Sequence, residues 1–404
     1  MIRKYLLLLI SIIFYTYLLQ WKVLLFCGLS IVIIAATRIR KNKKLASFIA
    51  ILMLSLGFIC IKFIYAYSTI LGYSVFAFTG ISYIVDQYKS HKPYSIIDTL
   101  LYLFFFPKML AGPIVRASEF IPQLSKEWNF TTKGLYSAFK LVVYALFIKL
   151  IIVDCLLNVP LDNYRGINLL CLTTVWGIKF YLDFYAYSIL AVGAALLFGI
   201  KLPFNFDCPY RASSFKEFWK RWNVTLSSWL KDYIYIPLGG NRCSKKRQYF
   251  NIMATFIVSA LWHGLNLPFI IWGIIHGMAV SLEHFVGGIS HIRNHIFKYS
   301  YSSIIFITVI LLWQLFRLHN IEAITEYVHQ LGTWSLANAK CIFLLLISFI
   351  VLACIDSKWC NKLTLSTSTS LKMIFCEAAI FTIILMFLLF FPTHYNIDFF
   401  YFKF

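Results

Sequence analysis

The chain has 404 residues, of which 60% are hydrophobic and 13% charged, with a mean hydropathy of +0.77 and a net charge of +21. This composition excludes an ordinary soluble domain and predicts an all-α polytopic membrane protein. The positive charge is concentrated in loops between apolar stretches, so nucleic acid is not expected as a partner.

Apolar stretches follow one another along the whole chain, and several reach the roughly 20 residues that a bilayer crossing needs. Others are shorter, and the segment between residues 200 and 240 is too polar for lipid. We therefore expect about eleven membrane-spanning helices together with re-entrant or interfacial helices. The stretches are 5–19, 22–36, 46–64, 69–85, 96–111, 135–158, 168–200, 224–238, 249–263, 267–286, 301–318, 341–355 and 371–392.

The N-terminal run after Arg3 and Lys4 resembles a signal peptide but lacks a small-residue cleavage site, so we interpret it as a retained anchor. Basic clusters near residues 3, 40 and 90 are separated by pairs of crossings and fall on one side, which the positive-inside rule assigns to the cytoplasm. The N-terminus is therefore expected in the cytoplasm. A basic face of this kind can also attract anionic donors or lipid head groups.

The ten cysteines show no C-x-x-C pair and no metal-ligand spacing with the histidines. Most lie in apolar stretches, where a free cysteine behaves as a small hydrophobic residue. We predict neither a structural metal nor a disulfide framework. A Ser/Thr-rich segment at residues 364–370 indicates a linker before the last span.

An amphipathic helix is predicted after residue 213. Ser214 and Glu217 form a capping box at its start, and Asn223 follows its apolar face by one residue. Such a helix either lies in the membrane interface or lines a central cavity, and the sequence leaves both open. Its apolar face comprises Phe215, Phe218, Trp219 and Trp222, and its basic face Lys216, Lys220 and Arg221.

His263 ends an apolar stretch, directly after Trp262, and the chain is broken immediately behind it by Gly264, Asn266 and Pro268. Irregular backbone at membrane depth is tolerated where it lines a cavity, and an ionisable residue there indicates a functional site. His263 is thus the leading candidate for proton chemistry. His276 is its competitor.

Two acids are further candidates for orienting groups. Asp183 lies within an apolar stretch, and Asp232 stands beside Lys231. For each of them a structural ion pair or hydrogen bond is an equally good interpretation. No G-x-S-x-G motif is present, so nothing in the sequence predicts a serine acyl-enzyme.

Several motifs together resemble one family. They are FPKMLAGPIVR at 106–116, FYLDFYAYS at 180–188, FNFDCPY at 204–210, FWKRW at 218–222, WLKDYIYIPLGGNR at 229–242, LWHG at 261–264, WQLFR at 313–317 and FFYFKF at 399–404. This series resembles the membrane-bound O-acyltransferases, most closely their bacterial branch of alginate O-acetyltransferase-like proteins. The resemblance is good over about residues 70–320 and at the last few residues, whereas the first 60 match only in hydropathy.

The resemblance implies a single integral membrane domain over 1–404, with N-terminal helices (1–67), a family core (68–320) and C-terminal helices (321–404) around a central tunnel. The family's invariant histidine corresponds to His263. Asn223 stands where the branch usually has a second histidine, which weakens a two-histidine mechanism. Tyr185 and Ala186 replace the branch's usual Ser and Gly. Further supporting or tunnel residues implied at the site are Trp262, Trp222, Trp219, Arg221, Asp183, Asp232 and His276.

The implied activity is transfer of an acetyl group from a cytoplasmic thioester, acetyl-CoA, to an extracytoplasmic polysaccharide or peptidoglycan in the bacterial cytoplasmic membrane. His263 would act as general base, and Asn223, Trp222 or a backbone N–H after His263 would stabilise the oxyanion. No permanently bound cofactor is implied, but a separate extracytoplasmic acetyltransferase or scaffold protein is. The alternatives are D-alanyl transfer to teichoic acid and a non-enzymatic lipid or saccharide transporter.

Overall fold

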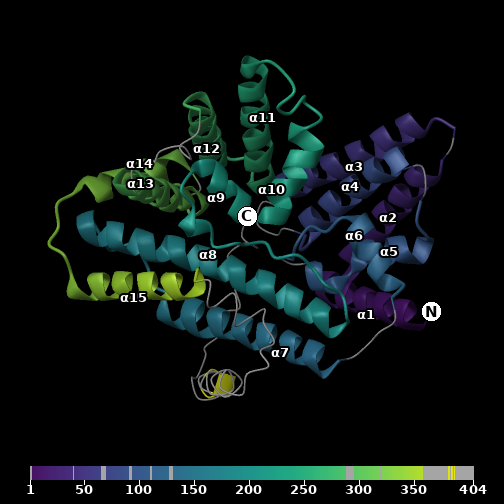
Figure 1. The fold of residues 1–404 in the computed structure, drawn as a ribbon, viewed down its shortest axis with the longest axis horizontal. Coiled ribbons are helices and arrows are strands. Elements are labelled where there is room, and N and C mark those ends of the chain that lie inside the picture. The colour runs from purple at the N-terminus through teal and green to yellow at the C-terminus, as the bar shows by residue number, and fades with distance from the viewer. Residues whose placement is uncertain are drawn as a thin grey trace. The chain divides into compact units, whose positions relative to one another are not determined.

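The computed structural model describes residues 2–39, 41–64, 70–90, 93–109, 112–126, 131–287, 295–318, 320–357, 381, 382, 384 and 386. Every regular element in this described part of the chain is a helix (Figure 1). The predicted last span at 371–392, the linker at 364–370 and the closing motif at 399–404 lie almost wholly outside the described residues.

The helices follow the apolar stretches closely, because a chain in hydrocarbon must satisfy its backbone groups internally. Short 3-10 turns and two π-helical segments connect some of them. In chain order they are α1 (Ile2–Leu19), α2 (Val23–Arg38), α3 (Lys43–Ile64), α4 (Tyr73–Ser90), α5 (Ile96–Phe104), α6 (Ala117–Leu124), α7 (Thr132–Leu146), a π-helical segment (Phe147–Leu156), α8 (Gly166–Leu197), α9 (Phe215–Arg221), α10 (Val224–Leu230), a second π-helical segment (Lys231–Tyr235), α11 (Lys245–His263), α12 (Leu267–Phe285), α13 (His295–Trp313), α14 (Ile321–Gly332) and α15 (Ala339–Ile355).

Five helical segments of the described chain are long and apolar enough to cross a membrane. The expected number of about eleven crossings stays a prediction, since several apolar stretches form shorter or more polar helices, as α5, α10 and α11 do, and the predicted last span lies almost wholly outside the described residues. The five segments are Ile2–Arg38, which contains both α1 and α2, then Lys43–Ile61, Gly166–Leu197, Leu267–Phe285 and Ile296–Phe316. The 3-10 turn Gln20–Lys22 separates α1 from α2, as the sequence predicted.

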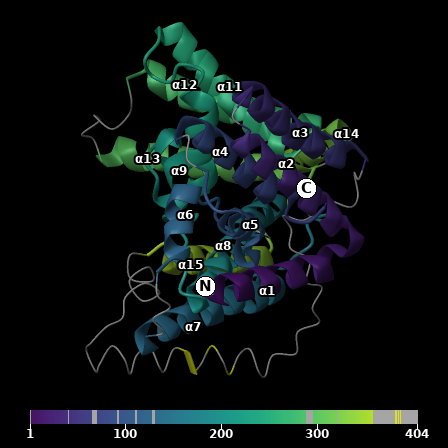
Figure 2. The same ribbon diagram turned by 90° about the vertical axis from the view of Figure 1, so that its right-hand side faces the viewer.

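The chain folds into two compact units, and the prediction of a single domain stays a prediction. The first unit comprises residues 1–139 and 187–204. In it α2, α3 and α4 pack side by side, as both ribbon views show (Figures 1 and 2). Its core is aromatic: the buried ring of Phe26 lies 4.9 Å from Phe76 and 5.5 Å from Tyr15.

The described part of the FPKMLAGPIVR motif in the first unit begins with a 3-10 turn, Phe106–Lys108. Lys108 is buried, and its Nζ lies 4.2 Å from the centre of the Tyr102 ring and 5.4 Å from that of Phe120. A side chain at Gly112 would collide with the Lys108 main chain, so the motif's glycine permits this close approach. Burial lowers the pKa of the Lys108 amine to about 7.

The second unit contains residues 140–186 and those from 205 onward, with α9–α15 and most of α8. Within its most apolar stretch of 18 residues, α8 has 72% of the residues buried, against 22% in α3, so most of this part of α8 is covered by protein. Within this unit α11 and α12 form a hairpin, standing side by side at the top of Figure 1.

Small residues let the two helices of the hairpin approach closely. A Cβ atom at Gly273 would lie 2.7 Å from Ala260 Cβ and 2.9 Å from the carbonyl oxygen of Phe256. We expect Gly273→Ala to destabilise the protein by about 1–3 kcal/mol through overpacking, measured as a lower Tm in detergent. Gly28→Ala is the control, since a Cβ there meets nothing within 4 Å; an equal loss of Tm in both variants would contradict the packing argument.

Candidate active site

The predicted amphipathic helix exists as α9. Phe215, Phe218 and Trp222 are buried, while Lys216 and Lys220 are exposed. The buried face packs on α12 inside the second unit. The choice between an interfacial helix and a helix that lines a central cavity stays a prediction.

The cap of α9 is more elaborate than the predicted capping box. Ser214 Oγ accepts a hydrogen bond from the Glu217 N–H at 2.9 Å, as predicted. The Glu217 carboxylate, however, accepts from the N–H and Oγ of Ser213 instead of from Ser214. The buried carboxylate of Glu283 accepts from the N–H groups of Phe215 (2.6 Å) and Lys216 (2.9 Å). A helix N-terminus is stabilised by such an acid, so α12 anchors α9.

Arg221 forms hydrogen bonds with nearby protein groups that hold its side chain in place. Its guanidinium donates to Glu217 Oε1 at 2.9 and 3.0 Å and to the Asp207 carbonyl oxygen at 3.0 Å. Burial by itself raises the pKa of the Glu217 carboxyl, but the hydrogen bonds from Ser213 and Arg221 outweigh burial and hold this pKa below its usual range. Arg221 therefore ties α9 to the FNFDCPY segment.

Asn223 occupies a left-handed turn between α9 and α10, with φ 40° and ψ 56°, and is only 6% exposed. Asparagine adopts this conformation more readily than most residues. The next residues are held in place, because Val224 N–H donates to the Asn205 carbonyl oxygen (2.8 Å) and Thr225 Oγ1 donates to Asn205 Oδ1 (2.6 Å).

His263 is the last residue of α11, at the tip of the α11–α12 hairpin, and is 9% exposed. The helix break follows directly, as predicted: Gly264 ends α11, and the Asn266 side chain caps α12 by accepting from the Phe269 N–H at 3.3 Å. The imidazole stands among aromatic rings. Its ring centre lies 4.5 Å from that of Trp262, 4.7 Å from Phe316 and 5.2 Å from Trp272.

His276 is fully buried in α12. Its Nδ1 accepts a hydrogen bond from Trp219 Nε1 at 3.3 Å, so the neutral ring carries its proton on Nε2. The Trp272 ring lies 5.1 Å from His276 and 5.2 Å from His263, on the path between the two imidazoles. A base has to reach substrate, and exposure favours His263 for that role.

An aromatic chain links the histidine region to the end of α9. Trp222 stacks on Trp313 with ring centres 4.5 Å apart, and Trp313 lies 5.3 Å from Phe316, which contacts His263. The structure thus places Trp219, Trp222, Trp262, His263 and His276 in one cluster, and Asn223 follows Trp222 in the chain.

The two predicted acids have different surroundings. Asp183 is buried and forms an ion pair with Lys149 at 2.8 Å, and Lys149 also binds Asp154 at 2.9 Å. This geometry favours the structural interpretation of Asp183. Asp232 is half-buried in the π-helical segment that follows α10.

Asp356, directly after α15, was missed by the sequence reasoning. Its buried carboxylate accepts hydrogen bonds from Tyr181 Oη (2.7 Å) and the Tyr210 N–H (3.3 Å). Tyr210 Oη accepts in turn from Trp313 Nε1 at 3.1 Å. Burial raises the pKa of Asp356 to about 6 although both hydrogen bonds act to lower it. The only sequence signal was an acid immediately behind an apolar stretch.

The cluster contains two imidazoles, and the more exposed of them, His263, lies at a break in the backbone. Among the described residues no three His, Cys, Asp or Glu side chains gather to hold a metal ion. The Gly264 N–H already donates to the Ala260 carbonyl oxygen at 3.1 Å, so a backbone donor for an oxyanion would have to come from Leu265 or Asn266.

Comparison with characterised proteins finds several relatives of this chain. The chain is 32% identical to a probable alginate O-acetylase of Pseudomonas aeruginosa, over 66% of this chain and 53% of that protein. It is 32% identical to a peptidoglycan O-acetyltransferase of Helicobacter pylori (63% of this chain, 55% of that protein) and 30% identical to a teichoic acid D-alanyltransferase of Bacillus subtilis (53% and 59%). The chain therefore spans little more than half the length of these relatives.

The model of the membrane-bound O-acyltransferase family matches residues 7–327. The match includes α1 to α3, for which the motifs gave only a resemblance in hydropathy, and it extends well beyond half of the chain. This protein belongs to the membrane-bound O-acyltransferase family.

Proposed function

We propose that this protein transfers acetyl groups from a cytoplasmic thioester, acetyl-CoA, to an extracytoplasmic polysaccharide or peptidoglycan, or to a partner transferase that acts on it. The observation that carries the proposal is His263 at the broken tip of the α11–α12 hairpin, in a chain related to O-acetylating proteins. About eleven crossings around a central tunnel, with the N-terminus in the cytoplasm, belong to the same proposal.

The proposed reaction needs one proton transfer and one oxyanion site. The acceptor hydroxyl oxygen attacks the thioester carbonyl carbon while His263 removes the hydroxyl proton. The C–S bond then breaks, and the proton passes from His263 to the departing thiolate. Asn223, Trp222 or a backbone N–H after Gly264 donates to the oxyanion that forms between these steps.

Asn223 is the second residue of the proposal. We expect Asn223→Ala to lower the transfer rate less than His263→Ala does. Alanine removes the amide and also disfavours the left-handed backbone by about 1–2 kcal/mol, so Asn223→Gly is the informative companion, because glycine keeps that backbone and lacks only the amide. Rates are measured with purified protein at matched folded concentration. A wild-type rate in Asn223→Gly would show that Asn223 serves the turn and not the chemistry.

The function itself is tested by alkali-labile acetate from envelope polysaccharides of the host. Acetate should disappear from a strain that lacks this chain and return when the chain is expressed. Unchanged acetate in the deletion strain would reject acetyl transfer.

D-alanyl transfer is the second candidate, since a teichoic acid D-alanyltransferase is among the relatives. Alkali-labile D-alanine measured in the same extracts separates the two: loss of D-alanine with acetate intact would replace acetyl by D-alanyl transfer.

A further inference from the structure

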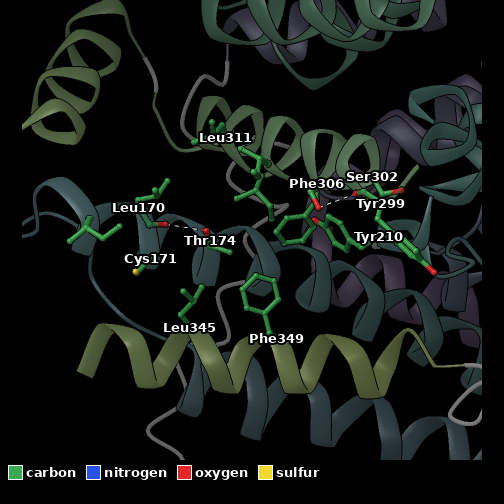
Figure 3. A pocket seen from close by; sticks show the side chains of 14 residues that line it. Leu170, Cys171, Thr174, Tyr210, Tyr299, Ser302, Phe306, Leu311, Leu345 and Phe349 are labelled. Atoms are coloured by element: carbon green, nitrogen blue, oxygen red, sulfur yellow. Dashed lines mark hydrogen bonds between the residues drawn. The ribbon is translucent and has the colours of Figure 1, made fainter. Parts of the chain in front are cut away.

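An open apolar groove runs along α8, α13 and α15 in the second unit. Two adjoining cavities of about 630 and 450 Å³ form it and share Tyr210, Phe306 and Phe349 in their linings. Figure 3 shows the larger of the two. Each volume lies within the roughly 300–1,000 Å³ of ligand sites. Large apolar side chains are accessible in the groove, with Ile307 54% and Phe349 41% exposed.

The groove has one apolar end and one polar end. At the apolar end are Ile167, Leu170, Leu311 and Leu345, whereas Arg211 and Asp356 line the cavity beyond Tyr210 at the other end. Two hydroxyl groups along the wall bond within their own helices: Thr174 Oγ1 donates to the Leu170 carbonyl oxygen, as a dashed line in Figure 3 shows, and Ser303 Oγ donates to that of Tyr299. These two residues therefore add little polarity to the wall.

The length of the groove matches one lipid leaflet. Its lining extends on α13 from Tyr299 to Leu311, which is about 18 Å at 1.5 Å per residue. Half of a hydrocarbon core of roughly 30 Å is about 15 Å, the reach of one acyl chain. Both α8 and α13 are long and apolar enough to cross a membrane, so a groove along them is placed to take up lipid.

The charged side chains at the polar end of the groove indicate the charge of a lipid head group that would bind there. Arg211 is exposed, and its Nη1 donates to the main-chain oxygen of Asp356 at 3.3 Å. The Asp356 carboxylate is only 5% exposed and accepts from Tyr181 Oη and the Tyr210 N–H, so Arg211 is the more accessible of these two charged groups. A guanidinium binds phosphate through paired N–H donors.

We propose that this groove is a binding site for an anionic phospholipid, with an acyl chain along α13 and the phosphate at Arg211. The bound lipid holds α15 against α8 and α13, and so supports the Asp356 network that reaches Trp313. This inference is independent of which acyl group the protein transfers.

The test uses the full-length protein in nanodiscs of phosphatidylcholine that contain a trace of spin-labelled phosphatidylglycerol or spin-labelled phosphatidylcholine. The motionally restricted fraction of each label gives its relative affinity for the protein surface. We expect phosphatidylglycerol to be preferred, and Arg211→Gln to lower that preference about fivefold, which corresponds to the ~1 kcal/mol of one basic residue near a membrane surface. Arg165→Gln, at an exposed arginine that lines neither cavity, is the control and should leave the preference unchanged.

The acyl-chain site is tested by making the same change, isoleucine to tryptophan, at two positions of α13. Ile307→Trp fills the groove, whereas Ile304→Trp, equally 54% exposed on α13, lies outside its lining. Only Ile307→Trp should reduce the restricted phosphatidylglycerol. If neither Ile307→Trp nor Arg211→Gln changes the restricted fraction, the groove is occupied by protein and the proposal is wrong. If both arginine variants act equally, the assigned position of the phosphate is wrong.

Discussion

His263→Ala is expected to lower the transfer rate by a factor of about 10²–10⁴, the usual contribution of a positioned general base. The histidine ends α11, so its replacement leaves the helix and the Asn266 cap of α12 intact. Folded protein should therefore be recovered at a normal level. The rate is measured as acyl transfer from a thioester to a soluble acceptor by purified protein, and in cells as alkali-labile acetate.

His276→Phe is the matched control for His263→Ala. Phenylalanine keeps a ring in the aromatic cluster and removes a buried Nε2 that has no hydrogen-bond partner in the described structure. Trp219 Nε1 loses its acceptor, which costs about 1–3 kcal/mol of stability, so the Tm should fall while transfer per folded molecule stays within tenfold of wild type. Complete loss of transfer in His276→Phe at an unchanged Tm, with His263→Ala active, would reverse the assignment of the base.

The helices and the position of His263 were predictable because both depend on local patterns. Apolar runs specify where the chain can be helical in lipid, and Gly264 with Asn266 and Pro268 specifies a break after His263. The aromatic face of α9 was predictable for the same reason, since positions three and four residues apart share one side of a helix.

The partners of buried acids were not predictable, because they come from distant segments. Glu283 caps α9 across 68 residues, and Asp356 binds Tyr181 across 175 residues. Glu283 lies near the end of an apolar stretch and Asp356 directly follows one, so in sequence each looks like an ordinary charge at a helix end. The number of crossings stays a prediction, because hydropathy alone does not distinguish a spanning helix from a short apolar helix such as α5.

Removal of Asp183 is expected to have the largest effect on stability. Its carboxylate and the Lys149 amine are 5% and 8% exposed and 2.8 Å apart. Asp183→Ala leaves a buried ammonium without this partner, and breaking a buried pair costs about 3–5 kcal/mol. We therefore expect a large fall in Tm and in the level of folded protein, measured by thermal unfolding in detergent, whereas the rate per folded molecule should change little.

The double variant Asp183→Leu with Lys149→Met distinguishes a structural pair from a catalytic acid. Removing both charges eliminates the desolvation cost that the pair carries, so the double variant should regain most of the Tm lost by Asp183→Ala. Asp154, the second partner of Lys149, is 23% exposed and can be hydrated when the amine is gone. A structural pair predicts that transfer returns with the folded protein. A double variant that is stable but inactive would show that Asp183 acts on the reaction, and would move the catalytic site towards α8.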